Sequence, residues 1–179
     1  MTNFDYKQAR HQAGIYGFVI GALWVASFGC YIAGLTIPLL SHLCIILGVS
    51  SPFVAAMLIR KYKQSVGNIN FWRTWWMALL IFMYATLLTA AGQYVYFRFI
   101  DNGRMLNAYT TLFESVEYQE LLQQAMPNGE GKEILSQALE LMGSMTPIEL
   151  TFELMFSNLI LGFILSIITA LLAQIPNKK

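Results

Sequence analysis

The sequence predicts an all-α integral membrane protein, a four-helix bundle in the bilayer with a two-helix amphipathic insert on its extracytoplasmic side. Only 12% of the 179 residues are charged and 56% are hydrophobic, whereas a soluble domain carries about 25% charged residues. The hydrophobic residues form uncharged stretches long enough to cross a bilayer, which needs about 20 residues per helix. The basic residues gather on one side of these stretches. We therefore expect a single membrane domain over residues 1–179.

The first two spans form one hairpin. Residues 12–59 contain no Asp, Glu, Lys or Arg, a run of 48 residues, which is enough for two spans. Gly34 is a favoured residue just past a helix end, and Pro38 suits the first turn of the next helix. The sequence predicts spans over residues 13–34 and 38–59.

The third and fourth spans lie on either side of a long connection. The 24 residues between Arg73 and Arg98 are uncharged and predict a span over residues 74–98. A second uncharged run of 24 residues follows Glu153 and predicts a span over 147–174. Thr146 and Glu149 flank Pro147 in the pattern of a capping box, which marks the helix start.

The connection, residues 102–146, has a mixed composition that predicts two amphipathic helices. The predicted helices cover residues 105–126 and 132–142. Apolar residues from Met105 to Val116 share one face of the first helix, and the second helix has a similar apolar face. Glu120 and Gln123 enter the first apolar face, so we expect a bend near Glu117. A Pro and Gly segment, 127–131, separates the two helices. We expect them to lie on the outer membrane surface or to cap the bundle.

The distribution of charge predicts sidedness. The two termini and the connection between the second and third spans share one side, with eight Lys and Arg and one Asp, a net +7. The other side has three Lys and Arg and nine Asp and Glu, a net −6. Because Lys and Arg are enriched in cytoplasmic segments, we expect cytoplasmic termini and a periplasmic insert.

Small residues at intervals of three or four define possible helix-packing faces, because close helix approach in lipid depends on van der Waals contact. Either the chain packs these faces within its own bundle, or one of them docks another subunit. The residues are Gly17, Gly21, Gly48, Ser51, Gly162 and Ser166.

Four polar residues in the spans form a possible site near the outer leaflet. His42, Gln93 and Glu153 are predicted at similar depth, and Asn158 lies one turn deeper. They could make interhelical hydrogen bonds worth about 0.6 kcal/mol each. Alternatively, they could bind a ligand or a proton, since polar groups in the membrane often mark function.

Two further features leave alternatives open. Cys30 and Cys44 are each seven residues from Ile37, so they could be buried inert thiols or a disulfide. Pro52 lies within the second span and predicts either a static kink or a hinge.

No phosphate loop, dinucleotide-binding glycine pattern, zinc-protease helix or nucleophile elbow occurs in the sequence. We therefore expect no catalytic residue, cofactor or metal, and the few basic residues favour no nucleic-acid partner. An enzyme is unsupported by any motif.

Two segments carry a family resemblance. Residues 147–173, with Gly162 and the ending Ser166-Ile167-Ile168-Thr169-Ala170-Leu171-Leu172, resemble the last span of a bacterial four-helix inner-membrane family. Gly67-Asn68-Ile69-Asn70-Phe71 resembles that family's segment before its third span. The family is known only by a domain-of-unknown-function label. The resemblance implies the inner membrane of a Gram-negative bacterium, and it implies no activity and no site residues.

Two functions fit these observations. The first is a non-enzymatic accessory or scaffold subunit of a bacterial envelope system, whose partners are the lipid bilayer and a membrane protein or further copies of the chain. The alternative is a small membrane carrier or lipid-handling protein that uses the outer-leaflet polar site.

Overall fold

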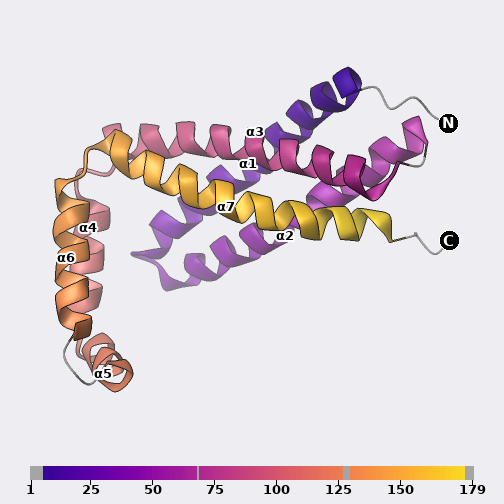
Figure 1. Cartoon of the computed structure of the whole chain (residues 1–179). Coiled ribbons are helices and arrows are strands. Elements are labelled where there is room, and N and C mark those ends of the chain that lie inside the picture. The colour runs from indigo at the N-terminus through magenta and orange to yellow at the C-terminus, as the bar shows by residue number, and fades with distance from the viewer. Residues whose placement is uncertain (1–5, 68, 127–129, 176–179) are drawn as a thin grey trace. The chain divides into compact units, whose positions relative to one another are not determined.

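The computed structural model describes residues 6–67, 69–126 and 130–175. Within these ranges the chain is entirely helical, with seven α-helices and no strand, which confirms the predicted all-α class. The helices are α1 (Tyr6–Gly34), α2 (Pro38–Val66), α3 (Phe71–Phe99), α4 (Arg104–Glu114), α5 (Val116–Ala125), α6 (Glu130–Ser144) and α7 (Pro147–Gln174) (Figure 1).

Four of these helices, α1, α2, α3 and α7, are long and apolar enough to cross a membrane. They correspond to the four predicted spans. The first hairpin breaks between Gly34 and Pro38, as predicted, but α1 already begins at Tyr6 and α2 continues to Val66. The helices therefore extend past the uncharged stretches into segments that carry Lys and Arg, because charge limits membrane burial and does not stop a helix.

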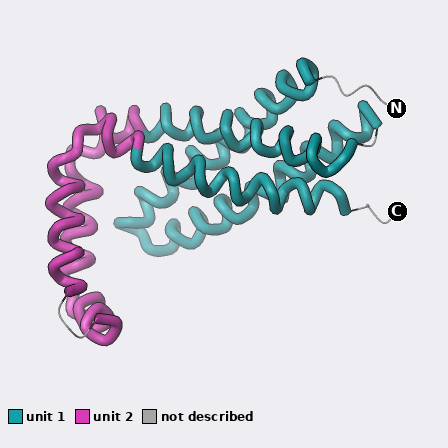
Figure 2. The backbone as a smooth tube through the Cα atoms, in the orientation of Figure 1, with its two compact units in different colours: residues 1–93, 153–179 teal, residues 94–152 magenta. Residues whose placement is uncertain are grey.

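The chain divides into two compact units (Figure 2). Unit 1 consists of residues 1–93 and 153–179 and contains α1, α2 and most of α3 and α7. Unit 2 consists of residues 94–152 and contains α4, α5 and α6.

Within unit 1, glycines bring the helices into close contact. A Cβ atom built on Gly17 would lie 2.5 Å from Cβ of Tyr84, and one on Gly21 would lie 3.0 Å from Cβ of Leu88, so α1 packs tightly on α3. Gly162 similarly places α7 on α3, since a Cβ atom there would lie 3.1 Å from Cβ of Phe82. Side chains larger than hydrogen would force these helices apart.

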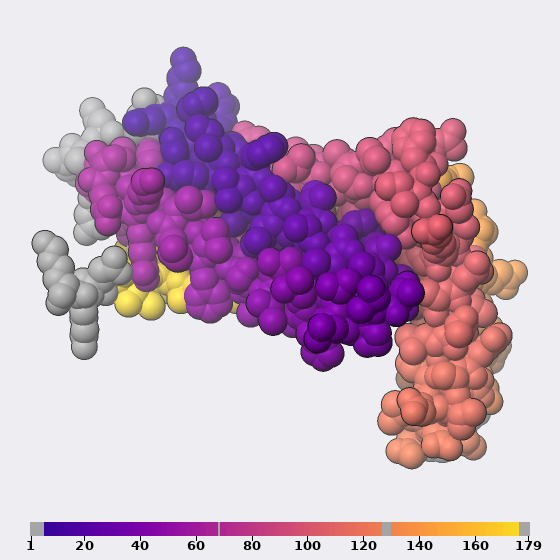
Figure 3. Space-filling view, turned by 180° about the vertical axis from the view of Figure 1, so that it is seen from behind, coloured from indigo at the N-terminus to yellow at the C-terminus, as the bar shows by residue number. Residues whose placement is uncertain are grey.

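The α1–α2 hairpin is equally tight. A Cβ atom on Gly34 would lie 2.8 Å from the backbone nitrogen of Ser41. α1 and α2 lie side by side on the face shown in Figure 3. Pro38 begins α2, as its fixed φ and missing N–H allow.

The last turn of α7 is bound by two cations of α2. The guanidinium of Arg60 donates to the carbonyl of Leu172, and Nζ of Lys63 donates to the carbonyl of Ala173 at 3.2 Å and to Oε1 of Gln174 at 2.9 Å. Carbonyl groups at a helix C-terminus lack intrahelical donors and carry partial negative charge, so cations there are stabilising. The α2 cations thus fix the C-terminal end of α7.

The prediction of a two-helix insert is wrong, because three helices, α4, α5 and α6, form between α3 and α7. The predicted first helix breaks at Ser115, which has extended backbone angles and accepts a hydrogen bond at its Oγ from the Tyr118 amide at 3.4 Å. Serine favours this capping role over a helix interior. The predicted bend near Glu117 is therefore a complete break two residues earlier. Residues 127–129, where the Pro and Gly segment was predicted, and Asn68 lie outside the described residues.

Glycines again set the close contacts in unit 2. A Cβ atom on Gly143 would lie 3.3 Å from Leu106, and one on Gly131 would lie 2.9 Å from Leu122, so α6 packs against both α4 and α5.

The predicted capping box at the start of α7 is confirmed. The Thr146 amide donates to Oε2 of Glu149 at 2.7 Å, and the Glu149 amide donates to Oγ1 of Thr146 at 3.4 Å.

Candidate functional site

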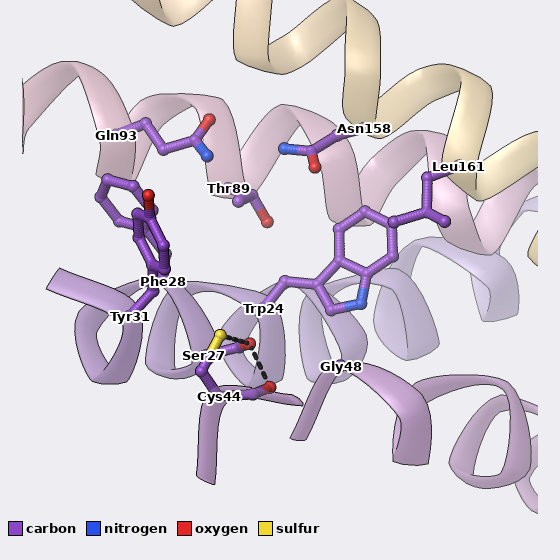
Figure 4. A pocket seen from close by; sticks show the side chains of 10 residues that line it. All are labelled: Trp24, Ser27, Phe28, Tyr31, Cys44, Gly48, Thr89, Gln93, Asn158 and Leu161. Atoms are coloured by element: carbon purple, nitrogen blue, oxygen red, sulfur yellow. Dashed lines mark hydrogen bonds between the residues drawn. The ribbon is translucent and has the colours of Figure 1, made fainter. Parts of the chain in front are cut away.

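A cavity of about 190 Å³ lies inside unit 1 and is lined by all four spans (Figure 4). It lies in the part of these helices nearest the α1–α2 connection. Its lining residues are Trp24, Ser27, Phe28 and Tyr31 of α1, Cys44 and Gly48 of α2, Thr89 and Gln93 of α3, and Asn158 and Leu161 of α7.

On one side of the cavity, a single hydroxyl group joins α1 to α2. Oγ of Ser27 donates to the carbonyl of Cys44 at 2.9 Å and lies 3.5 Å from its Sγ (Figure 4). Cys30 and Cys44 are both free thiols, so no disulfide joins them in this structure. The Ser27 hydroxyl is therefore bound within the protein.

Pro52 shapes the α2 wall one turn further along. A proline has no N–H, so the carbonyl of Gly48, four residues earlier, loses its helical donor. The Ser51 hydroxyl replaces this donor and lies 2.7 Å from the Gly48 carbonyl oxygen. A Cβ atom on Gly48 would have Ser27 Oγ as its sole neighbour within 4 Å, at 3.9 Å, so the open side of Gly48 faces the cavity.

The α3–α7 side carries polar groups that are not fully used. The side chain of Gln93 is only 4% exposed, and its Oε1 is buried with no hydrogen-bond partner among the described residues. The carboxamides of Gln93 and Asn158 point toward one another above Thr89 (Figure 4). Thr89 itself donates to the Ala85 carbonyl at 2.8 Å. An unsatisfied buried acceptor costs about 1–3 kcal/mol, so Gln93 is an exceptional group that a bound donor would stabilise.

The four polar residues predicted as a site separate into two pairs. Gln93 and Asn158 line the cavity. His42 is exposed and its Nδ1 lies 3.2 Å from the Pro38 carbonyl oxygen of its own helix, and Glu153 is exposed on α7. Neither of these two lines the cavity. Depth along a helix can be estimated from sequence, but the direction of the side chain around the helix depends on packing.

The residues predicted for helix packing occupy two kinds of place. Gly17, Gly21 and Gly162 lie in close helix contacts. Ser51 and Ser166 are fully buried, and Ser166 accepts a hydrogen bond from the Trp75 indole at 3.0 Å. Gly48, in contrast, lines the cavity.

Sequence reasoning missed Ser27, Thr89 and the aromatic residues Trp24, Phe28 and Tyr31 as lining residues. Isolated hydroxyl and aromatic residues are common in spans, and no spacing distinguishes those that face a cavity. Counting from Ile37 pairs Cys44 with Cys30 and not with Ser27, so the spacing in the sequence did not single out Ser27.

The chemistry of the cavity is neutral. None of its lining residues is Asp, Glu, Lys, Arg or His. In the described part of the chain, no group of three or more His, Cys, Asp or Glu side chains is placed to hold a metal ion. The cavity therefore offers hydrogen bonds and aromatic surface to a ligand.

Two further cavities lined by described residues contain no buried polar side-chain atom without a partner. One of about 210 Å³ in unit 2 is lined by Asp101, whose carboxylate already accepts hydrogen bonds from the Tyr96 hydroxyl and the amides of Gly103 and Met105. Another of about 180 Å³ between α3 and α7 is lined by apolar side chains and Thr86, which donates to the Phe82 carbonyl.

Comparison with known proteins places this architecture in a family. The model of the family described as "Protein of unknown function (DUF4199)" matches residues 14–174. The chain belongs to this family. The DUF4199 match includes all ten residues that line the cavity and the whole of α4, α5 and α6. No curated protein and no solved structure matches the chain.

Proposed function

We propose that this protein binds an amphipathic molecule in the cavity of unit 1 and acts as a small carrier or lipid-handling protein. The observation that carries the proposal is Gln93, which lines the cavity and whose Oε1 is buried without a partner among the described residues. If this position served only to pack one helix against another, an apolar residue would be favoured there, because an unsatisfied acceptor reduces stability. Asn158 on α7 adds a second carboxamide on the same side.

In this proposal α1, α2, α3 and α7 form a transmembrane bundle in a bacterial inner membrane. The charge distribution favours cytoplasmic termini and a periplasmic location of α4, α5 and α6. Fusions of alkaline phosphatase and of green fluorescent protein after Gly67 and after Gly103 test this topology. We expect fluorescence alone after Gly67 and phosphatase activity alone after Gly103, and the reverse pattern would contradict the orientation.

Binding is tested by filling the cavity. A leucine at Gly48 would project into the empty space, where its Cβ has one neighbour at 3.9 Å. Gly29 is the matched control, since a Cβ atom there has no neighbour within 4 Å and the residue is exposed on α1. Native mass spectrometry of protein purified in mild detergent should detect a bound molecule in the wild type and in Gly29→Leu. The Gly48→Leu variant should lack it, and equal retention by both variants would contradict the proposal.

A second candidate function is an accessory or scaffold subunit of an envelope system. Apolar side chains of Val116, Leu121, Ile134 and Leu141 are 58–73% exposed on α5 and α6, beside several Glu residues. Such residues suit contact with a partner. The small residues of the spans offer less support, because Gly17, Gly21 and Gly162 already pack within unit 1. Crosslinking in native membranes followed by purification tests this role, and a monomer without crosslinked partners would contradict it.

A further inference from the structure

We infer that the ligand of the unit 1 cavity is an uncharged lipid with a hydroxyl-bearing headgroup, such as a diacylglycerol or a long-chain alcohol. This inference rests on the proposed binding function and specifies its ligand class. The juxtaposition that carries it is the unpartnered Gln93 acceptor, the Asn158 carboxamide and the absence of charge among the lining residues.

The headgroup must be neutral. No lining residue carries a charge, so an anionic or cationic group would enter without a counter-ion. Removing an ion from water is costly unless an opposite charge and hydrogen bonds replace the water. Phosphate-bearing lipids therefore fit this cavity poorly.

The headgroup must also donate a hydrogen bond. Oε1 of Gln93 accepts hydrogen bonds and cannot donate them, so a ligand that satisfies it supplies an O–H or N–H group. The Asn158 carboxamide on α7 offers both donors and an acceptor from the same side of the cavity. A hydroxyl group, which donates once and accepts twice, matches this pair.

The cavity is large enough for the headgroup of such a lipid but not for its acyl chains. The cavity has a volume of about 190 Å³. This space holds a glycerol-sized group and leaves no room for acyl chains. The apolar part of the ligand must therefore remain outside the cavity.

A route for the chains lies between α2 and α7. These helices are joined beyond the cavity, where the Thr169 hydroxyl donates to the Pro52 carbonyl at 3.4 Å and where Arg60 and Lys63 bind the end of α7. At the level of the cavity the two helices instead present Gly48, which lacks a side chain, and Leu161, which is 47% exposed. A headgroup can thus enter from the lipid side while its chains stay in the bilayer.

The deciding experiment changes the ligand by single groups and leaves the protein intact. The full-length chain in detergent micelles is titrated with dioctanoylglycerol, with the methyl ether of dioctanoylglycerol, and with dioctanoyl phosphatidic acid. Binding is followed by the change in tryptophan emission, because Trp24 lines the cavity, and by native mass spectrometry. We expect dioctanoylglycerol to bind about tenfold more tightly than its ether, which lacks the donor, and than the phosphate-bearing lipid.

A variant then assigns the difference to Gln93. Gln93→Leu keeps the volume of the side chain and removes the acceptor. It should weaken binding of dioctanoylglycerol about tenfold and leave binding of the ether unchanged. Gly29→Leu should bind all three lipids as the wild type does.

The outcomes distinguish a wrong ligand class from a wrong binding site. Equal affinity for the alcohol and the ether, or a preference for phosphatidic acid, with loss of binding in Gly48→Leu, would overturn the ligand class and keep the site. No binding of any of the three lipids by the wild type, or binding unchanged in Gly48→Leu, would overturn the site itself and leave the cavity as a water-filled space.

Discussion

The indole Nε1–H of Trp75 donates a hydrogen bond to Oγ of Ser166 across 3.0 Å and so joins α3 to α7 within unit 1. Ser166 is fully buried and its own hydroxyl donates to the Phe163 carbonyl at 2.6 Å. The ring of Trp75 also meets that of Phe163 edge to face, with centroids 6.0 Å apart. Trp75 therefore makes a polar contact with Ser166 and an aromatic contact with Phe163 of α7.

The first prediction concerns this pair. In a double-mutant cycle of Trp75→Phe and Ser166→Ala, we expect a coupling energy of about 0.6 kcal/mol, the usual value for an interhelical hydrogen bond in lipid. The free energy of unfolding in mixed micelles of detergent and SDS provides the measurement. Trp72 is 71% exposed, so a cycle of Trp72→Phe and Ser166→Ala should give no measurable coupling energy. Equal coupling for both tryptophans would show that the hydrogen bond does not stabilise the protein.

The second prediction concerns the glycine contact between α1 and α3. Gly17→Ala should lower the free energy of unfolding by about 1–3 kcal/mol, because the new methyl group would lie 2.5 Å from Tyr84 Cβ and 2.9 Å from the Ile81 carbonyl oxygen. Gly14→Ala, one turn earlier with no neighbour within 4 Å, is the matched control and should be neutral or slightly stabilising. The same mixed-micelle unfolding assay applies. Similar values for the two variants would contradict the close approach of these helices.

The third prediction concerns the last turn of α7. Lys63→Met should remove the hydrogen bonds to the Ala173 carbonyl and the Gln174 side chain. We expect the amides of residues 171–174 to exchange hydrogen about tenfold faster, since a hydrogen bond to a charged group contributes about 1.5–3 kcal/mol, less where water competes. Lys61→Met, at an exposed residue of the same helix, should leave exchange unchanged. Protection that persists in Lys63→Met would mean that Lys63 does not hold this helix end.

The fourth prediction concerns the start of α4. Asp101 is 9% exposed and its carboxylate accepts from the Tyr96 hydroxyl at 2.8 Å and from the Gly103 and Met105 amides at 3.1 and 3.0 Å. Asp101→Ala should cost about 1–3 kcal/mol and increase hydrogen exchange in the first turn of α4, because three donors lose their acceptor. Asp101→Asn should retain part of this protection through its remaining acceptor oxygen. Glu114→Ala, at an exposed residue of α4, should have little effect, and an equal effect of both alanine variants would refute the role of Asp101.

The four spans could be predicted from sequence because uncharged runs and the Gly34 and Pro38 signals act locally. The capping box at Thr146 and Glu149 is local as well, and it formed as predicted. The break at Ser115 was placed too late, because the apolar face weakens gradually and a serine can either continue a helix or cap one. Local rules thus describe helix ends better than helix interruptions.

The lining of the cavity could be predicted only in part from the sequence. Depth placed Gln93 and Asn158 near one another, but the same argument also included His42 and Glu153, which are exposed on their helices. The direction of each side chain depends on how α1, α2, α3 and α7 rotate against one another, and glycines such as Gly17 and Gly162 determine that rotation. The open space beside Gly48 likewise depends on how α2 packs on α1, which required the backbone geometry.

The close contact between Gly34 and Ser41 has a consequence for biogenesis. Three residues, Leu35, Thr36 and Ile37, connect α1 to α2, and none of them is charged. A translocon that releases α1 and α2 together as a preformed helical hairpin has only this short uncharged tip to move through the bilayer. The segment between α3 and α7 carries most of the chain's acidic residues, and in the orientation proposed above it would have to be exported across the membrane. We expect the two halves of the chain to differ in their dependence on the export motor during synthesis.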